Sequence, residues 1–235
     1  KNCAIEPEIK DLINFLRKMG CNIKWTGKRT VTIIGKNELK KTKYKIMSDR
    51  IEAGTYMIAA ALTCGNLKIK NVNSKIINTE INVLKKIGAL IKINNNEIHV
   101  IGKKKIKNIK LKTSPYPGFP TDLQAQLMVL LCKAQGKSVI SEEIFENRFM
   151  HASELNRMGA KIKIIGNKAL IEGNISFQAA ELMATDLRAS VSLILAGLTA
   201  KGKSIINRIY HLDRGYEDIE KKLSNVGAHI KRISY

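Results

Sequence analysis

The chain has 235 residues and a formal net charge of +21 at pH 7, because 41 Lys and Arg stand against 20 Asp and Glu. Its 44% of hydrophobic residues are enough for a packed core, which excludes a disordered basic tail. No apolar run approaches the roughly 18 residues of a membrane span. The first residues, KNCAIEPEIK, lack the apolar stretch of a signal peptide. A soluble cytoplasmic protein is therefore expected.

The positive charge alone would suggest nucleic-acid binding, since Lys and Arg neutralise phosphates. However, the chain has 32 Lys, 34 Ile and 19 Asn but only 9 Arg, a bias typical of codons rich in A and T, and its aromatic content is 5%. Only 103–112, KKKIKNIKLK, is dense in Lys, and its alternation predicts a strand with Lys outward and Ile or Leu inward. We expect neither a specific nucleic-acid partner nor a membrane partner.

One sequence block recurs four times and predicts a helix that ends on a glycine and is followed by strands. The glycines are Gly20, Gly88, Gly159 and Gly227, at spacings of 68, 71 and 68 residues. A Leu stands four residues before each glycine and an Ile three residues after it. Glycine can adopt the left-handed conformation that ends a helix and turns the chain into a strand.

A second block recurs three times and predicts a buried helix. It covers 48–65, 120–136 and 184–202, and each copy begins with a small or hydroxyl residue and Asp and closes on Gly. Helices as apolar as AAAL, LMVLL and SLILAG need burial nearly all round. With the first block they predict an α/β repeat of strand, helix, strand, helix, strand and strand, about 70 residues long, with helices inside and sheets outside.

The repeats divide the chain into two parts. Residues 48–235 form one domain of three units, 48–102, 103–173 and 174–235. Residues 1–47 form the end of an earlier unit.

Cysteine and histidine spacing predicts no metal site, because there is no C-x-x-C pair and no histidine cluster. The residues concerned are Cys3, Cys21, Cys64, Cys132, His99, His151, His211 and His229. Free thiols in a reducing compartment are expected, with no metal and no cofactor.

Asp49, Asp122 and Asp186 occupy equivalent places at the predicted starts of the three buried helices. Helix capping alone explains an Asp there. If the three helix starts converge, they would also form an anion site for phosphate or carboxylate.

Five of the nine arginines fall near these helix starts or in the loops that follow them: Arg50, Arg148, Arg188, Arg208 and Arg214. A guanidinium suits carboxylate and phosphate better than an ammonium does. A surface ion pair is as good an explanation for any one of them, and it is the clustering that favours an anion site. Segment 113–122 holds three of the four prolines and leads into Asp122, which fits either a positioned general base or a rigid connector.

Several motifs resemble those of the UDP-N-acetylglucosamine 1-carboxyvinyltransferases, a family of enolpyruvyl transferases. They are SDRIEAGTYMIAAA, GFPTDLQAQ, IFENRFMH, NRMGAKI, ATDLRASVSLILAG and RIYHLDRGYEDIEKKL. The resemblance covers nearly all of this chain, which corresponds to the C-terminal portion of the family's full-length sequences. It implies an inside-out α/β barrel and a cytoplasmic monomer. The implied reaction transfers the enolpyruvyl group of phosphoenolpyruvate to the 3-hydroxyl of UDP-N-acetylglucosamine and releases phosphate, the first committed step of peptidoglycan synthesis.

The resemblance also implies roles for individual residues. Asp122 would contact the sugar hydroxyl and act as the base, and Ile144 would contact the nucleotide sugar through its backbone. The arginines that would bind phosphoenolpyruvate are Arg148, Arg188 and Arg214, of which Arg188 and Arg214 would also take part in catalysis. Asp49 and Asp186 correspond to family aspartates near the site.

Two alternatives stay open. A 3-phosphoshikimate 1-carboxyvinyltransferase shares the fold and the reaction, although GFPTDLQAQ, ENRFMH and HLDRGYE favour the nucleotide-sugar enzyme. A non-catalytic remnant or basic binding module would instead bind duplex DNA tightly and with a steep dependence on salt.

We predict that this chain alone does not turn over. In the family, a Lys-Asn pair and a loop cysteine precede the part that it resembles, and residues 1–47 resemble the last repeat of an incomplete first domain. A phosphate-release assay with phosphoenolpyruvate and UDP-N-acetylglucosamine measures this, and substantial turnover would contradict the prediction.

Overall fold

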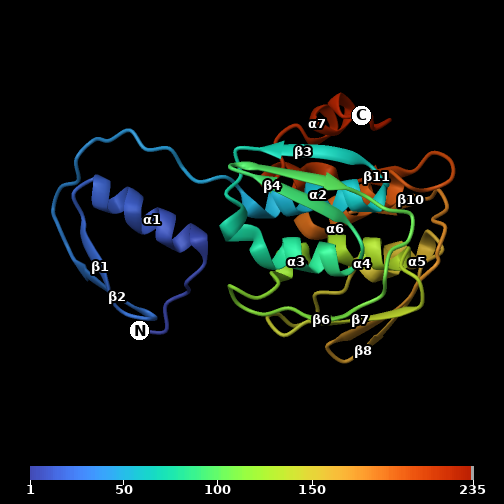
Figure 1. Cartoon of the computed structure of the whole chain (residues 1–235), viewed down its shortest axis with the longest axis horizontal. Coiled ribbons are helices and arrows are strands. Elements are labelled where there is room, and N and C mark those ends of the chain that lie inside the picture. Colours follow the sequence, from blue (N-terminus) through green and yellow to red (C-terminus); the bar gives the residue numbers. More distant parts are fainter. Residues whose placement is uncertain (234–235) are drawn as a thin grey trace.

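The computed structural model describes residues 1–233, and the first of its units is a helix followed by a hairpin. Helix α1 (Pro7–Lys18) begins with proline in its first turn, where the missing N–H is not needed, and β1 (Asn22–Gly27) pairs antiparallel with β2 (Thr30–Ile34). Residues 35–49 form no helix or strand. In Figure 1 this unit lies to one side of the rest, joined to it by that segment.

The next unit contains a buried helix and a three-stranded sheet. Its elements are α2 (Arg50–Leu62), β3 (Asn66–Lys70), the 3-10 turn η1 (Ser74–Ile77), α3 (Asn78–Lys86), β4 (Leu90–Asn94) and β5 (Glu97–Ile101). The strand order is β3-β5-β4, and both pairings are antiparallel. The glycine that ends α3, Gly88, has φ +112°, as its place in the repeat predicts.

The third unit repeats this plan with one more strand in front. Its elements are β6 (Lys110–Lys112), η2 (Thr121–Leu123), α4 (Gln124–Cys132), β7 (Lys137–Ser141), α5 (His151–Arg157), β8 (Lys161–Ile165) and β9 (Lys168–Glu172). The sheet order is β6-β7-β9-β8, with β6 parallel to β7. The strand predicted from IKNIKLK, 106–112, is thus limited to its last three residues, although Ile106 and Ile109 are buried as predicted.

The last unit contains β10 (Glu181–Met183), α6 (Leu187–Gly197), β11 (Ile205–Asn207), η3 (Ile209–Arg214) and α7 (Ile219–Asn225), with β10 parallel to β11. The strand expected after Gly227 is absent, since 228–233 form none. In the two preceding units, the last strand of the hairpin bridges the outer strand to the sheet. Up to residue 233 the last unit has no such bridging strand, so residues 228–233 have no strand to pair with through backbone hydrogen bonds.

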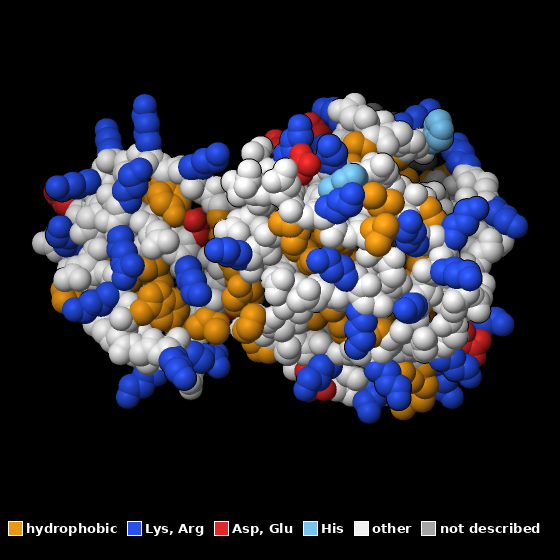
Figure 2. Space-filling model, viewed as in Figure 1, with side chains coloured by type: hydrophobic (Ala, Val, Ile, Leu, Met, Phe, Trp, Pro, Cys, Tyr) orange, Lys and Arg blue, Asp and Glu red, His pale blue; other side chains and the backbone are white. Residues whose placement is uncertain are grey.

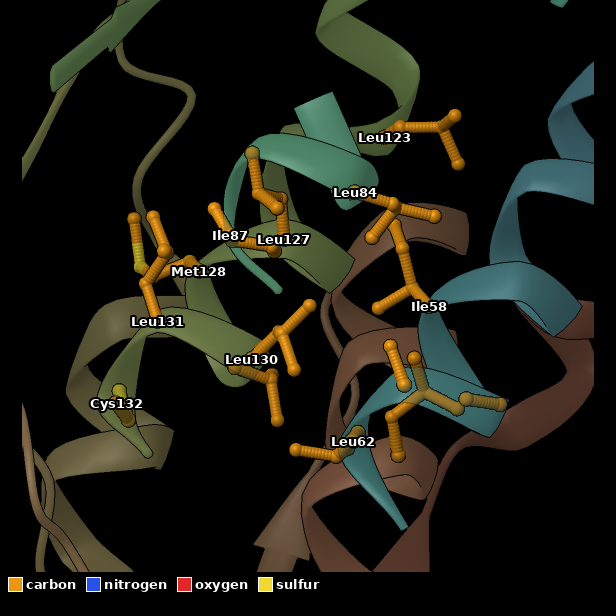
Figure 3. Close-up of a cluster of buried hydrophobic side chains, with 14 of the residues drawn as sticks. Ile58, Leu62, Leu84, Ile87, Leu123, Leu127, Met128, Leu130, Leu131 and Cys132 are labelled. Carbon is orange, nitrogen blue, oxygen red and sulfur yellow. The ribbon is translucent and has the colours of Figure 1, made fainter. Parts of the chain in front are cut away.

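Helices α2, α4 and α6 form the interior, as their apolar sequences predict. All nine residues of α4 are buried, and α4 packs against both α2 and α6. Figure 3 shows side chains of α2, α3 and α4 converging, among them Ile58, Leu84 and Leu127. Each such side chain contributes roughly 1.5–3 kcal/mol by leaving water, which explains why these helices take the centre.

The sheets carry the charge on their outer faces. In β9, Ala169 and Ile171 are buried, whereas Lys168 and Glu172 are exposed. Figure 2 shows Lys and Arg side chains scattered over the visible face with hydrophobic patches between them. The positive charge therefore lies on solvated surface, on helices and loops as well as on the sheets. Among residues 1–233, no helix is long and apolar enough to cross a membrane.

Two glycines at equivalent places in the repeat lie against backbone atoms at the ends of the interior helices and just beyond them. Gly102 and Gly173 directly follow β5 and β9. A Cβ at Gly102 would lie 2.7 Å from the Cα of Cys64, and one at Gly173 would lie 2.6 Å from the carbonyl oxygen of Gly136. Both neighbours are backbone atoms, so they cannot move aside as a side chain could.

We predict that Gly102→Ala and Gly173→Ala each lower the free energy of unfolding by about 1–3 kcal/mol, because the added methyl group overpacks a backbone contact. Urea unfolding followed by circular dichroism measures this. Gly35→Ala is the control, since a Cβ there meets nothing within 4 Å. A change in the two variants no larger than that of the control would contradict the close packing.

Candidate functional site

Asp49 and Asp186 cap the helices that they precede. Asp49 accepts hydrogen bonds from the backbone N–H groups of Ile51 (2.7 Å) and Glu52 (3.0 Å). Asp186 accepts them from Arg188 (2.7 Å) and Ala189 (3.0 Å). Helix capping therefore accounts for both carboxylates at α2 and α6.

Asp122 lies at the equivalent place before α4, within η2, yet makes no capping bond. Its carboxylate instead meets two guanidinium groups. The Oδ2 atom lies 2.6 Å from Nη2 of Arg188, and Oδ1 accepts a hydrogen bond from Nη1 of Arg148 at 3.2 Å. The three charged groups come from η2, from the first turn of α6 and from the loop between β7 and α5.

The two arginines keep Asp122 ionised. Burial by itself would raise the pKa of Asp122, but the hydrogen bond and charge of Arg188, followed by those of Arg148, hold it below its usual value. At pH 7 the group is thus a carboxylate in a cationic setting. Such a carboxylate can accept a proton only if the guanidinium groups turn to another anion.

Two cavities have Arg188 and Arg214 in common. One, of about 460 Å³, is lined by Arg148, Asp186, Arg188 and Arg214. The other, of about 790 Å³, lies between α1 and the helix starts and is lined by Asp49, Asp122, Arg188 and Arg214. Three arginines on one cavity wall suit an anion with carboxylate or phosphate oxygens.

Two of the five arginines considered from the sequence lie outside this arrangement. Arg50 is buried, and its guanidinium bonds to Glu8 (2.8 Å) and Glu80 (3.3 Å). Arg208 is exposed and donates to the hydroxyl of Tyr210 at 3.0 Å. A buried carboxylate and an aromatic neighbour draw the two side chains away, so the expected cluster is reduced to Arg148, Arg188 and Arg214.

Ile144 lies in the loop after β7 and lines a further cavity of about 780 Å³. Its backbone N–H donates to Oε1 of Glu142 at 2.9 Å, so only its carbonyl oxygen is free to contact another group.

The sequence reasoning missed two polar side chains of the 460 Å³ cavity, Gln124 and His151. Both are buried, and neither the amide Nε2 of Gln124 nor Nε2 of His151 has a hydrogen-bond partner. Burial lowers the pKa of His151 to about 4, so its ring is neutral at pH 7. A signal for Gln124 was present, because an amide at the start of an otherwise apolar helix needs a partner in the interior.

The second amide of that helix has such partners. The Nε2 of Gln126 donates to the carbonyl oxygen of Asp122 (3.0 Å) and to the hydroxyl groups of Thr55 (3.1 Å) and Tyr216 (3.3 Å). Thr55 and Tyr216 are themselves joined at 2.7 Å. This buried network ties the backbone of Asp122 to α2 and to the segment after η3.

A metal site does not form among these groups. In residues 1–233, no set of three or more His, Cys, Asp or Glu side chains could hold a metal ion. The 460 Å³ cavity offers three guanidinium groups beside the carboxylates of Glu146 and Asp186, of which Asp186 caps a helix.

Comparison with known proteins gives one family. The model of the EPSP synthase (3-phosphoshikimate 1-carboxyvinyltransferase) family matches residues 1–223. A UDP-N-acetylglucosamine 1-carboxyvinyltransferase of Pelagibacter ubique is 76% identical over 99% of this chain and 56% of its own length. The enzyme of that name from Rickettsia akari is 54% identical over 99% of this chain and 55% of its own length. The chain thus spans about half the length of the curated relatives it matches.

Solved structures share the fold. The enolpyruvyl transferase NikO from Streptomyces tendae superposes with a TM-score of 0.90 at 26% identity, over 98% of this chain and 55% of that one. EPSP synthase from Acinetobacter baumannii gives a TM-score of 0.72 at 22% identity, over 93% of this chain and 54% of that one, and shows likeness of fold alone.

We predict that Asp122→Asn lowers the free energy of unfolding by about 1 kcal/mol at pH 7, because it removes the charged acceptor of two guanidinium groups. The folded-state pKa lies below the unfolded value of about 3.9, so this stabilisation is present above that pH and is lost as the pH falls through the folded-state pKa. Urea unfolding at pH 7 and pH 3 measures the difference.

The control is Asp218→Asn, because Asp218 is half-exposed and its one ion pair within residues 1–233 is with Lys221, at 3.0 Å. Its effect should be smaller, as expected for a surface pair. An Asp122→Asn deficit that persists unchanged at pH 3 would argue against the ion-pair explanation.

Proposed function

The chain belongs to the EPSP synthase (3-phosphoshikimate 1-carboxyvinyltransferase) family, and from that premise we propose that it carries the proton-transfer and anion-binding groups of an enolpyruvyl transferase. The observation that carries the proposal is Asp122 held between Arg148 and Arg188, at cavities that Arg214 also lines. The acceptor substrate that we propose is UDP-N-acetylglucosamine, because the curated relatives at 76% and 54% identity bear that name.

The proposed reaction joins the 3-hydroxyl oxygen of the sugar to C2 of phosphoenolpyruvate. The hydroxyl loses its proton and C3 of phosphoenolpyruvate gains one, which gives a tetrahedral adduct that still carries the phosphate. The C3 proton then leaves, the C–O bond to phosphate breaks, and the enolpyruvyl ether and inorganic phosphate remain. No oxidant, metal or cofactor enters this balance.

Asp122 is the proposed base, and its arginine partners explain how it becomes one. While Arg148 and Arg188 bond to it, the pKa of Asp122 is held low, and it is a poor proton acceptor. An incoming carboxylate or phosphate competes for the same guanidinium groups. As these turn to the anion, the carboxylate loses its stabilising partners, and its basicity rises when the sugar hydroxyl is in place.

Arg148, Arg188 and Arg214 are the proposed ligands of phosphoenolpyruvate. These guanidinium groups already lie at the cavities before the substrate arrives, and after Arg148 and Arg188 turn from Asp122 to the anion they stabilise the negative charge of the adduct. Asp186 has a supporting role, since its carboxylate accepts from the backbone N–H of Arg188 and thereby fixes the turn that carries it. Asp49 does the same for the start of α2, which borders the larger cavity.

Ile144 is the proposed backbone contact of the nucleotide sugar. Because Glu142 occupies its N–H, the contact is made by its carbonyl oxygen, which accepts hydrogen bonds and therefore suits an N–H or hydroxyl donor of the ligand.

We further propose that residues 48–235 form one domain, with units at 48–102, 103–173 and 174–235, and that residues 1–47 belong to another. The matching order of elements in the units and the absence of regular structure across 35–49 support this division. A cytoplasmic setting is supported by the four unpaired cysteines, which are typical of a reducing compartment. A role in peptidoglycan synthesis follows from the proposed acceptor.

The alternative acceptor is shikimate 3-phosphate, for which the family is named. A titration of the labelled chain, followed by NMR, distinguishes the two. We expect UDP-N-acetylglucosamine to shift the amide signals of the 142–150 loop and of η2, and phosphoenolpyruvate to shift the side-chain Nε signals of Arg148 and Arg188. A response to shikimate 3-phosphate and none to the nucleotide sugar would overturn the proposed acceptor.

Arg188→Lys should weaken phosphoenolpyruvate binding about tenfold or more, since an ammonium cannot reproduce the planar fork. Arg157→Lys is the matched control, because Arg157 is exposed and pairs only with Glu154 on its own helix, at 2.9 Å. Equal affinities of the two variants for phosphoenolpyruvate would show that Arg188 does not bind the anion.

A further inference from the structure

Glu142 is a buried carboxylate with no role so far in the proposed reaction. It directly follows β7 and is 3% exposed. Within residues 1–233 no Lys, Arg or His lies in ion-pair distance of it. A buried carboxylate without a cation is costly unless several donors surround it. Its place in the fold therefore calls for a specific explanation.

The two oxygens of Glu142 have different partners. Oε1 accepts from the hydroxyl of Thr113 (2.9 Å) and from the backbone N–H groups of Ile144 (2.9 Å) and Phe145 (3.2 Å). Oε2 accepts from the hydroxyl of Thr121 at 2.8 Å. Oε1 thus shapes the start of the 142–150 loop, whereas Oε2 reaches the residue next to Asp122.

The bond from Thr121 determines which way its hydroxyl points. A carboxylate can only accept, so the one hydroxyl hydrogen of Thr121 is directed at Oε2. Lone pairs alone then face Nη1 of Arg148, which donates to this hydroxyl at 3.0 Å and to Oδ1 of Asp122 at 3.2 Å. The carboxylate of Glu142 thereby makes the Thr121 hydroxyl an acceptor for Arg148.

We propose that Glu142 is a positioning residue, which orients the Thr121 hydroxyl so that Arg148 is held against Asp122. The inference deepens the proposed function, on which its catalytic purpose rests, but the hydrogen-bond relay itself needs no substrate. A purely structural role for Glu142 would involve Oε1 and the loop turn only. The hydrogen bond of Oε2 with Thr121 therefore distinguishes a positioning role from a purely structural one.

Glu142→Gln tests the relay with an isosteric change. The amide oxygen takes the Oε1 position, because the reverse orientation would set the NH₂ group against three donors. The NH₂ group then faces Thr121 and donates to its hydroxyl, so the hydroxyl hydrogen must turn away from residue 142, where it competes with Nη1 of Arg148. Thr121→Val removes the hydroxyl without any change of charge.

The readout is the pKa of Asp122, measured by carboxyl ¹³C NMR on the 235-residue chain without ligand. Arg148 is one of the two groups that lower this pKa. We expect it to rise by about 0.5 in Thr121→Val and to rise also in Glu142→Gln, as the pairing with Arg148 weakens. Removal of the Glu142 charge alone would lower the pKa, so a rise identifies the loss of Arg148.

Thr113→Val is the matched control. It removes a fully buried hydroxyl that bonds to Glu142 on the Oε1 side. It should lower the melting temperature and leave the pKa of Asp122 unchanged. The double variant Glu142→Gln with Thr121→Val should show no larger rise than Thr121→Val alone, because both act through one hydroxyl.

An unchanged pKa of Asp122 in folded Thr121→Val, or a fall in Glu142→Gln, would overturn the relay. Neither result depends on any substrate, so it would leave the proposed function standing. Conversely, a failed substrate titration would leave the relay intact.

Discussion

The burial of α2, α4 and α6 is the constraint on which the rest of this structure depends. These helices are apolar on nearly every side, and α4 is buried along its whole length. Such helices are stable only in the centre, so the amphipathic strands must cover them from outside. The same packing gathers the loops that lead into the three helices, where polar side chains have access to the cavities.

Charge is distributed by the cost of removing it from water. Lys side chains are scattered over the surface, where hydration is retained and each contributes little. Near the cavities, Arg148 and Arg188 pair with the carboxylate of Asp122, because a guanidinium keeps its charge on burial and a partner offsets the lost hydration. Asp122, Arg148 and Arg188 form such a set, and Arg50 with Glu80 forms another that is committed to structure. Anion binding therefore depends on which of these ion pairs an incoming anion can break.

Several features could be read from local patterns. The glycine repeat predicted the ends of α1, α3, α5 and α7, and the apolar runs predicted the three interior helices. The prediction of a strand after Gly227 was wrong, because a strand needs a neighbouring strand to bond with and residues 228–233 pair with none. The prediction that Arg208 belongs to the arginine cluster was also wrong. Its side chain bonds to Tyr210, because a place near a helix start in the sequence does not direct a long side chain toward that start.

The sequence by itself determined the repeat, the helices that must be buried and the residue types available for anion chemistry, because these follow from hydrophobic period and side-chain composition. Only the tertiary structure decided that Asp49 and Asp186 cap helices while Asp122 pairs with Arg148 and Arg188. It also placed His151 at the cavity that Arg148 and Arg188 line, and it brought Glu142 to Thr121, the residue next to Asp122. The three aspartates look equivalent along the chain. Their roles differ because Asp49 and Asp186 bond to the backbone of the helices that they precede, whereas Asp122 bonds to side chains of the 142–150 loop and of α6, which no local pattern encodes.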